Sequence, residues 1–273
     1  MNRIKKIFGK DREILIGAIH FSPLLGYPDF PSFKVAEKNA LYDLKVFQDG
    51  GLNSVIFENN YDLPHAVIVT PEVGVAMTYL GEKIVCKADV PVGIDVLWND
   101  FRCALAIAKT LSLSFIRVPV FVDTVKTDCG IIRGEAEKVI ATRKKFGAED
   151  VAIFADIHVK HSKLLSKYSL VESARRAIKK GADALIVTGK WTGDAPDLRE
   201  LKELRKAVGN FPIFTGSGAD ERNIKEILQF ANGVIVSTSL KAGQNRKGEH
   251  NVKAYDQRVD AKKVRQFVKI ARG

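Results

Sequence analysis

Short runs of β-branched and aromatic residues recur along the chain and alternate with segments of helical spacing. The strand-like runs lie at residues 14–20, 54–58, 91–97, 115–120, 151–158, 184–188, 212–215 and 234–237. Runs that are apolar on both faces are typical of a parallel sheet covered by helices. Eight alternating strand and helix units therefore predict a closed (β/α)8 barrel, the TIM-barrel architecture.

The segments between these runs carry the start signals of helices. Ser169 and Glu172 have the spacing of a capping box, and Pro71 suits the first turn of a helix. Asp220 and Asp260 are expected to be N-caps. These signals support the helices that the apolar period predicts.

An open, doubly wound sheet is the alternative arrangement of the same units. That fold places a G-x-G-x-x-G turn after its first strand, whereas the first run here leads into Phe21-Ser22-Pro23. We therefore predict a single barrel domain over residues 1–273, with residues 1–13 as an N-terminal extension.

Composition restricts the class of protein further. With 46% hydrophobic residues the chain can form a packed core, which excludes overall disorder. No apolar stretch reaches the roughly 18 residues of a membrane span, and no secretory signal is recognisable. The three cysteines, Cys86, Cys103 and Cys129, form no C-x-x-C pair. We expect a reduced, cytoplasmic protein without a transmembrane segment.

Positive charge exceeds negative charge, with 43 Lys and Arg against 32 Asp and Glu. Part of the excess lies near the C-terminus, at Arg258, Lys262, Lys263, Arg265, Lys269 and Arg272. Such a face can attract nucleic acid or an anionic membrane. No nucleic-acid module accompanies it, so we predict a solvated helix face, no nucleic-acid partner and at most a peripheral membrane contact. We also expect a homo-oligomer.

Polar residues close several of the runs, and in barrels of this type the chemistry lies at the C-terminal ends of the strands. The candidate acid/base residues are His20, Glu58, Asp156 and His158. The candidate substrate-binding residues are Asn99, Arg117, Lys160 and Thr188. Because residues two apart on a strand share a face, Asp156, His158 and Lys160 are expected to face the lumen together.

Two of these residues allow a second interpretation. Arg117 could form an internal ion pair with Glu58 or Asp156 that only orders the lumen. Lys160 could be a Schiff-base nucleophile if burial or a neighbouring cation lowered its pKa. A lysine at a barrel mouth is more often an anion contact, which is the role we favour for it.

A metal site is the alternative use of the imidazole and carboxylate groups. His158, His161 and Asp156 could combine with His20 and Glu58 to bind zinc or iron. The two histidines would face opposite sides of a continuing strand, and their spacing is not diagnostic of a metal. We predict neither a metal nor a cofactor.

Glycine, serine and threonine follow the last two strand-like runs. The candidate phosphate-binding residues are Gly216, Ser217, Gly218, Ser237, Thr238 and Ser239. Glycines let main-chain N–H groups approach an anion, and the loops after strands 7 and 8 form the phosphate site of many such barrels. We predict a phosphate site here, with two ordinary tight turns as the alternative. A bulky residue at Gly218 is expected to block the anion and to leave the fold intact.

A long segment, at residues 122–134, follows the fourth strand-like run. It is a candidate lid over the barrel mouth, with a plain surface loop as the alternative.

Several segments together resemble the BtpA family. They include Gly17-Ala18-Ile19-His20, Phe57-Glu58-Asn59, Trp98-Asn99-Asp100, Asp156-Ile157-His158-Val159-Lys160-His161 and Ser237-Thr238-Ser239-Leu240-Lys241. The resemblance covers almost the whole chain and implies a barrel of the ribulose-phosphate-binding type. The family takes its name from a member needed for photosystem I biogenesis, and the resemblance implies no particular reaction.

These observations favour an enzyme, of lyase or isomerase type, that binds a small phosphorylated metabolite such as a sugar phosphate or a nucleotide-related phosphate. Asp156 or Glu58 would be the base and His158 or His20 the acid. Arg117 or Lys160 would stabilise a developing oxyanion. The alternatives are a non-enzymatic assembly or regulatory factor, which the family name suggests, and a metal-dependent hydrolase.

Overall fold

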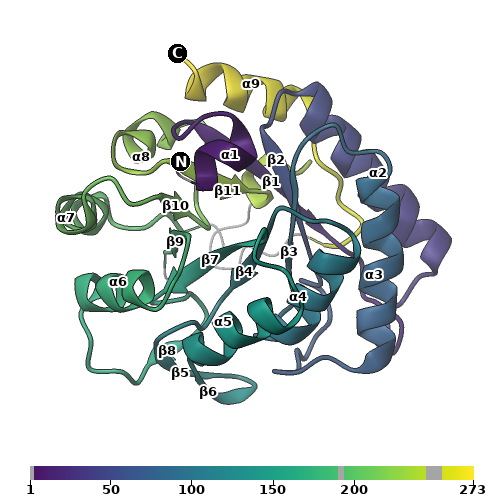
Figure 1. Cartoon of the computed structure of the whole chain (residues 1–273). Helices are drawn as coiled ribbons and strands as arrows, with labels where there is room; N and C mark the ends of the chain where they lie inside the picture. Colours follow the sequence, from purple (N-terminus) through teal and green to yellow (C-terminus); the bar gives the residue numbers. More distant parts are fainter. Residues whose placement is uncertain (1–2, 190–193, 244–253) are drawn as a thin grey trace.

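In the computed structural model, which describes residues 3–189, 194–243 and 254–273, eight parallel strands close into a barrel (Figure 1). Their order around the barrel is β1-β11-β10-β9-β7-β4-β3-β2. The strands are β1 (Ile14–His20), β2 (Ser54–Glu58), β3 (Val92–Asp95), β4 (Phe115–Val118), β7 (Ala152–Ile157), β9 (Ala184–Val187), β10 (Ile213–Thr215) and β11 (Gly233–Val236). The predicted TIM barrel is confirmed, and no predicted strand end differs from the structure by more than two residues.

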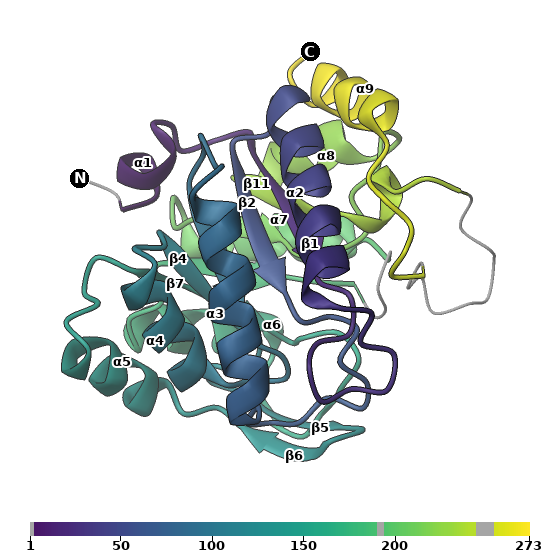
Figure 2. The same cartoon turned by 90° about the vertical axis from the view of Figure 1, so that its right-hand side faces the viewer.

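Helices surround the strands as an outer layer (Figures 1 and 2). They are α2 (Phe33–Asp49), α3 (Pro71–Val85), α4 (Phe101–Thr110), α5 (Ala136–Lys145), α6 (Leu170–Lys179), α7 (Leu198–Val208), α8 (Ile224–Phe230) and α9 (Ala261–Ala271). The capping box of Ser169 and Glu172 and the N-cap at Asp260 are confirmed. The N-cap predicted at Asp220 is wrong, because α8 begins three residues later, with Asn223 as its N-cap.

Helix α1 (Arg3–Phe8) closes the N-terminal end of the lumen. Ile4 is fully buried in the apolar cluster that fills the lumen. The ring of Phe8 lies 6.0 Å from that of Phe115 and 6.4 Å from that of Phe154. Helix α1 of the N-terminal extension is therefore packed against the barrel core.

A small antiparallel sheet lies beside the other end of the barrel. It contains β5 (Thr124–Thr127), β6 (Gly130–Arg133) and β8 (Lys163–Leu164), in the order β6-β5-β8. The candidate lid at residues 122–134 is thus a β-hairpin. β8 follows closely after β7, so pairing with β8 ties this hairpin to a barrel strand.

Within the described ranges, no helix combines the length and the apolar character that crossing a membrane requires.

Candidate functional site

Four polar side chains form a row across neighbouring strands at the C-terminal end of the lumen. His20 is in register with Glu58, Glu58 with Asp95, and Asp95 with Arg117. Residues in register on parallel strands point to the same face, and the residues two positions earlier on β1, β2 and β4 belong to the lumen cluster. We call His20, Glu58, Asp95 and Arg117 the lumen row.

Arg117 is the shared partner of three buried carboxylates. It donates two hydrogen bonds of 2.8 Å to Asp156, from Nε to Oδ1 and from Nη2 to Oδ2. Its nitrogens also lie 3.5 Å from Asp95 Oδ2 and 3.6 Å from Glu58 Oε1. The internal ion pairs that the sequence allowed for Arg117, with Glu58 and with Asp156, are both present.

Burial shifts the protonation of the groups around Arg117. It raises the pKa of Asp95 well above its ordinary value, and neither oxygen of this carboxyl accepts a hydrogen bond within the described part of the chain. Burial, with the nearby cations Lys241 and Lys160, lowers the pKa of His20 well below its ordinary value. His20 is therefore neutral at pH 7, with its Nε2 3.7 Å from Glu58 Oε2.

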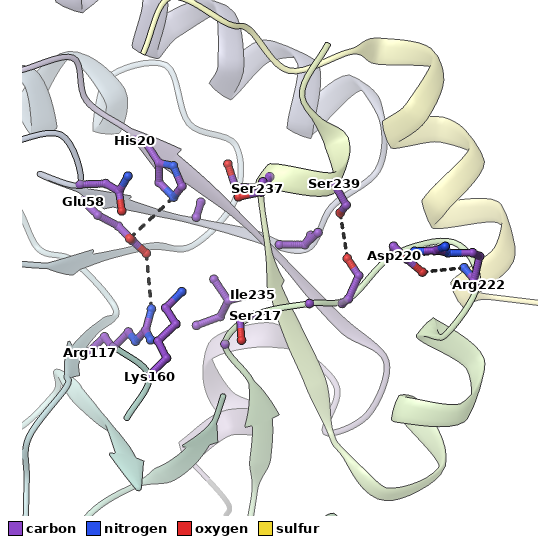
Figure 3. Close-up of a pocket in the computed structure, with 17 residues that line it drawn as sticks. His20, Glu58, Arg117, Lys160, Ser217, Asp220, Arg222, Ile235, Ser237 and Ser239 are labelled. Carbon is purple, nitrogen blue, oxygen red and sulfur yellow. Dashed lines mark hydrogen bonds and ion pairs between the residues drawn. The ribbon is translucent and has the colours of Figure 1, made fainter. Parts of the chain in front are cut away.

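A small cavity of about 90 Å³ lies between the lumen row and the turns after β10 and β11 (Figure 3). His20, Glu58, Arg117 and Lys160 line one side of it. Residues 216–220 and 235–239 line the other side. The predicted phosphate turns therefore face the predicted acid/base residues across one space.

Two serine hydroxyls hold these turns in place. Ser217 Oγ accepts a hydrogen bond of 3.1 Å from the amide of Gly189 and donates one of 2.9 Å to the carbonyl of Asp194. Ser239 Oγ donates a hydrogen bond of 2.8 Å to the carbonyl of Ala219 and so ties the two turns together (Figure 3). These two hydroxyls are occupied by the protein itself.

Other donors in the same turns have no partner. The hydroxyl of Ser237 is buried without a hydrogen bond to any described residue. Among the hydrogen bonds of the described residues, none uses the amide N–H of Gly218, Ala219, Thr238 or Ser239. Buried polar groups are nearly always hydrogen-bonded in folded proteins, so this group of free donors is suited to an anion.

The two glycines of the first turn have different roles. Gly218 has φ +72°, and a Cβ on it would lie 2.0 Å from the amide nitrogen of Ala195. The expectation that a bulky residue here would leave the fold intact is therefore wrong. A Cβ on Gly216 would lie 2.7 Å from Ile186 Cγ2 and 3.1 Å from Thr188 Cγ2, so this glycine makes room for neighbouring side chains at the end of β9.

A larger cavity of about 730 Å³ adjoins the small one. Residues 126–128 of the hairpin and residues 159–163 line it, together with Leu97 and Trp98. Glu58, Asn60, Arg117 and Lys160 line both cavities. The two spaces therefore meet at one acidic, one amide and two basic side chains.

The structure does not bring His158 into either cavity. β7 ends at Ile157, and His158 has φ +50°, so the strand alternation on which its placement depended stops one residue too early. Asp156 also lines neither cavity, since both of its oxygens accept hydrogen bonds from Arg117.

Two predicted substrate-binding residues have structural contacts instead. The side-chain amide of Asn99 binds both backbone groups of Val120, at 3.1 Å and 2.8 Å. Thr188 Oγ1 accepts a hydrogen bond of 2.9 Å from the amide of Lys160. Neither side chain lines the described cavities, but Thr188 holds the backbone at Lys160.

Sequence reasoning left two site residues out. Asp95 lies late in the strand predicted at residues 91–97, so its position near a strand end was an available signal. Asn60 lies beyond β2, where strand alternation gives no direction. Among the described residues, no group of three or more His, Cys, Asp or Glu side chains is arranged to hold a metal ion.

Comparison with known proteins places this chain among relatives of similar length. The model of the BtpA family matches residues 11–273. The photosystem I biogenesis protein BtpA of Synechocystis is 38% identical over 234 residues, which are 85% of this chain and 81% of that protein. An uncharacterised protein of Pyrococcus abyssi is 32% identical over 95% of this chain and 97% of its own length.

Solved structures of low sequence identity share the fold. N-(5'-phosphoribosyl)anthranilate isomerase of Pyrococcus furiosus has a TM-score of 0.57 at 15% identity, covering 96% of this chain and 99% of its own. Tryptophan synthase of M. tuberculosis has a TM-score of 0.59 at 13% identity, covering 100% of this chain and 99% of its own. At this level of identity the likeness concerns the fold alone.

Proposed function

This chain belongs to the BtpA family, and on that premise we propose that it is an enzyme that binds a small phosphorylated metabolite and acts on it by acid/base chemistry. The phosphate occupies the small cavity. The remainder of the substrate extends past Glu58 and Lys160 into the large cavity.

The observation that carries this proposal is the set of unpartnered donors at the small cavity. The Ser237 hydroxyl and the free amides at residues 218–219 and 238–239 belong to residues that line the same cavity as Arg117 and Lys160. Main-chain amides with nearby cations are the groups that proteins use to bind phosphate. Leaving them unsatisfied would cost free energy, which a bound anion would recover.

The same geometry suggests how the reaction proceeds. Binding energy from the phosphate holds the reacting carbon beside the lumen row. Glu58 is the base, because it lines both cavities and touches Arg117 only at 3.6 Å. Neutral His20 can donate or accept a proton at Nε2 on the same wall. Asp156 keeps Arg117 in place and does not contact the substrate.

The similar barrels agree with a phosphorylated substrate by analogy of fold. The name of the isomerase from Pyrococcus furiosus describes a phosphoribosyl compound. We expect the protein to act in the cytoplasm and as a homo-oligomer.

Isothermal titration calorimetry tests the proposal with three probes, which are ribose 5-phosphate, ribose and inorganic phosphate. We expect ribose 5-phosphate and phosphate to bind and to compete, and ribose not to bind. If neither phosphate compound binds, the phosphate site does not exist. A non-enzymatic assembly factor, as the name of the Synechocystis relative suggests, would then be the better hypothesis.

A further inference from the structure

Lys160 occupies the junction of the two cavities. It lines both of them, and its side chain runs beside that of Arg117 toward the small cavity (Figure 3). If the phosphate group of a substrate lay in the small cavity and the rest of the substrate in the large one, the atoms between them would lie beside this amino group. Lys160 is therefore placed beside the part of a substrate that reacts.

The charges around Lys160 are already paired with one another. Glu58, Asp95 and Asp156 all lie within 3.6 Å of Arg117. The ion pairs and hydrogen bonds of the described residues include none made by the amino group of Lys160. The cluster thus leaves one of its two cations without a carboxylate partner.

The backbone holds Lys160 firmly. Its amide donates a hydrogen bond of 2.9 Å to Thr188 Oγ1, on the neighbouring barrel strand. His158 and His161 both have positive φ, so the chain bends on each side of Lys160 before it joins β8. These bends and the hydrogen bond restrict the backbone of Lys160. A restricted backbone is what a side chain needs if it must approach a substrate in one orientation.

We infer that Lys160 is a nucleophile that forms a Schiff base with the carbonyl carbon of a phosphorylated aldehyde or ketone. This inference rests on the proposed function and specifies its substrate class. An amine without an ion-pair partner, in a cavity whose opposite wall binds phosphate, has the position that this chemistry needs.

The covalent step balances without a co-reactant. The neutral amine attacks the carbonyl carbon, a C–N bond forms, and the C=O electron pair moves to oxygen. Glu58 moves one proton from the nitrogen to the oxygen, which gives a carbinolamine. It moves a second proton the same way as the nitrogen lone pair forms the C=N bond and the C–O bond breaks, so that the oxygen leaves as water. The products are an imine and one water molecule.

The electrostatics agree with an amine that is partly neutral near pH 7. Burial, and then the charge of Arg117, lower the pKa of Lys160 to about 8, against the opposing effect of Glu58, Asp156 and Asp95. Other charged or titratable groups line the two cavities, and they are His20, His65, His161, Asp220, Arg222, Lys126, Asp128 and Lys163. At about pH 7.5, Lys160 would have a roughly hundredfold larger neutral fraction than an ordinary lysine.

Borohydride trapping tests the inference on the full-length protein. Glycolaldehyde phosphate is the probe and glycolaldehyde is its unphosphorylated control, with peptide mass spectrometry to locate the reduced adduct. We expect the adduct on Lys160 with the phosphorylated probe, a midpoint near pH 8 in its pH profile, and suppression by inorganic phosphate. The competition with inorganic phosphate is measured on the natural protein, so its result does not depend on whether a variant folds.

Lys160→Arg should abolish the adduct while phosphate binding persists. Lys225→Arg is the matched control, because Lys225 is exposed on α8 and lines neither cavity, and it should leave the adduct unchanged. Phosphate binding without an adduct on Lys160, or an adduct spread evenly over many lysines, would overturn the inference and leave the proposed function standing. If the natural protein neither binds phosphate nor forms the adduct, both the inference and the proposed function are overturned.

Discussion

The guanidinium group of Arg117 donates two hydrogen bonds of 2.8 Å to the carboxylate of Asp156, and both side chains are buried. Each oxygen of Asp156 is therefore occupied. The pair also holds Arg117 where Glu58 and Asp95 can approach it. A carboxylate in this arrangement is a structural partner of the arginine and not a proton acceptor for a substrate.

Replacing Asp156 by Asn should therefore reduce stability. Removing one charge of a buried pair leaves the other uncompensated, and the free energy of unfolding should fall by about 3 kcal/mol. Urea unfolding monitored by circular dichroism measures this loss. Glu58→Gln is the comparison, and its loss should be clearly smaller because the contact of Glu58 with Arg117 is 3.6 Å. Equal losses in the two variants would contradict the structural role of Asp156.

Position near the C-terminal end of a strand accounts for what could be predicted of this site. It placed His20, Glu58 and Arg117 at the barrel mouth, because each lies within a strand whose earlier residues face the lumen. It failed for His158 and Asn99, which lie beyond the ends of β7 and β3. There the direction of a side chain depends on backbone turns and local hydrogen bonds.

The mouth of the barrel was the least predictable part of the fold. The hairpin β5–β6 has short strands, and its core is shared with residues from distant loops, among them Trp98 and Val159. Local pattern cannot reveal such contacts, since they form only when the barrel closes. The sequence predicted that the turns containing Gly218 and Ser237 bind phosphate. It could not predict which of their hydroxyls stay unpaired, because that depends on tertiary contacts.

Ser237→Ala should weaken phosphate binding. The hydroxyl has no partner among the residues that the structure describes, and a hydrogen bond to a charged group contributes about 1.5–3 kcal/mol, so the Kd for inorganic phosphate should rise about tenfold or more. Calorimetry measures the change. Ser22→Ala is a matched control, because Ser22 also has a buried, unpaired hydroxyl but lines neither cavity. If both variants bind phosphate as the natural protein does, Ser237 is not a ligand contact.

Ile4→Ala should destabilise the barrel even though Ile4 precedes the first strand. The side chain is fully buried in the lumen cluster, and truncating such a residue costs about 2–5 kcal/mol. Val35→Ala, at a position that is 41% exposed on α2, should change stability by only about 0.5 kcal/mol. Thermal and urea unfolding compare the two variants. Similar small losses would show that α1 contributes little to the core.

Asp95→Asn should change how stability depends on pH. The folded-state pKa of Asp95 lies well above its unfolded value, because the carboxyl is fully buried. Below the unfolded pKa the carboxyl is protonated in both states, and its contribution to stability is fully present. As pH rises, the unfolded chain releases the proton before the folded protein does, so stability is lost until the pH passes the folded pKa.

An asparagine at this position stays neutral and avoids that loss. The stability of Asp95→Asn relative to the natural protein should therefore improve as the pH rises from 5, until the pH passes the folded-state pKa of Asp95, as measured by urea unfolding at several pH values. Asp89→Asn, at an exposed carboxylate, is the control and should show no such trend. A relative stability that does not change between pH 5 and pH 8 would mean that Asp95 is already ionised in the folded protein at pH 5. Its 3.5 Å contact with Arg117 would then outweigh the cost of its burial.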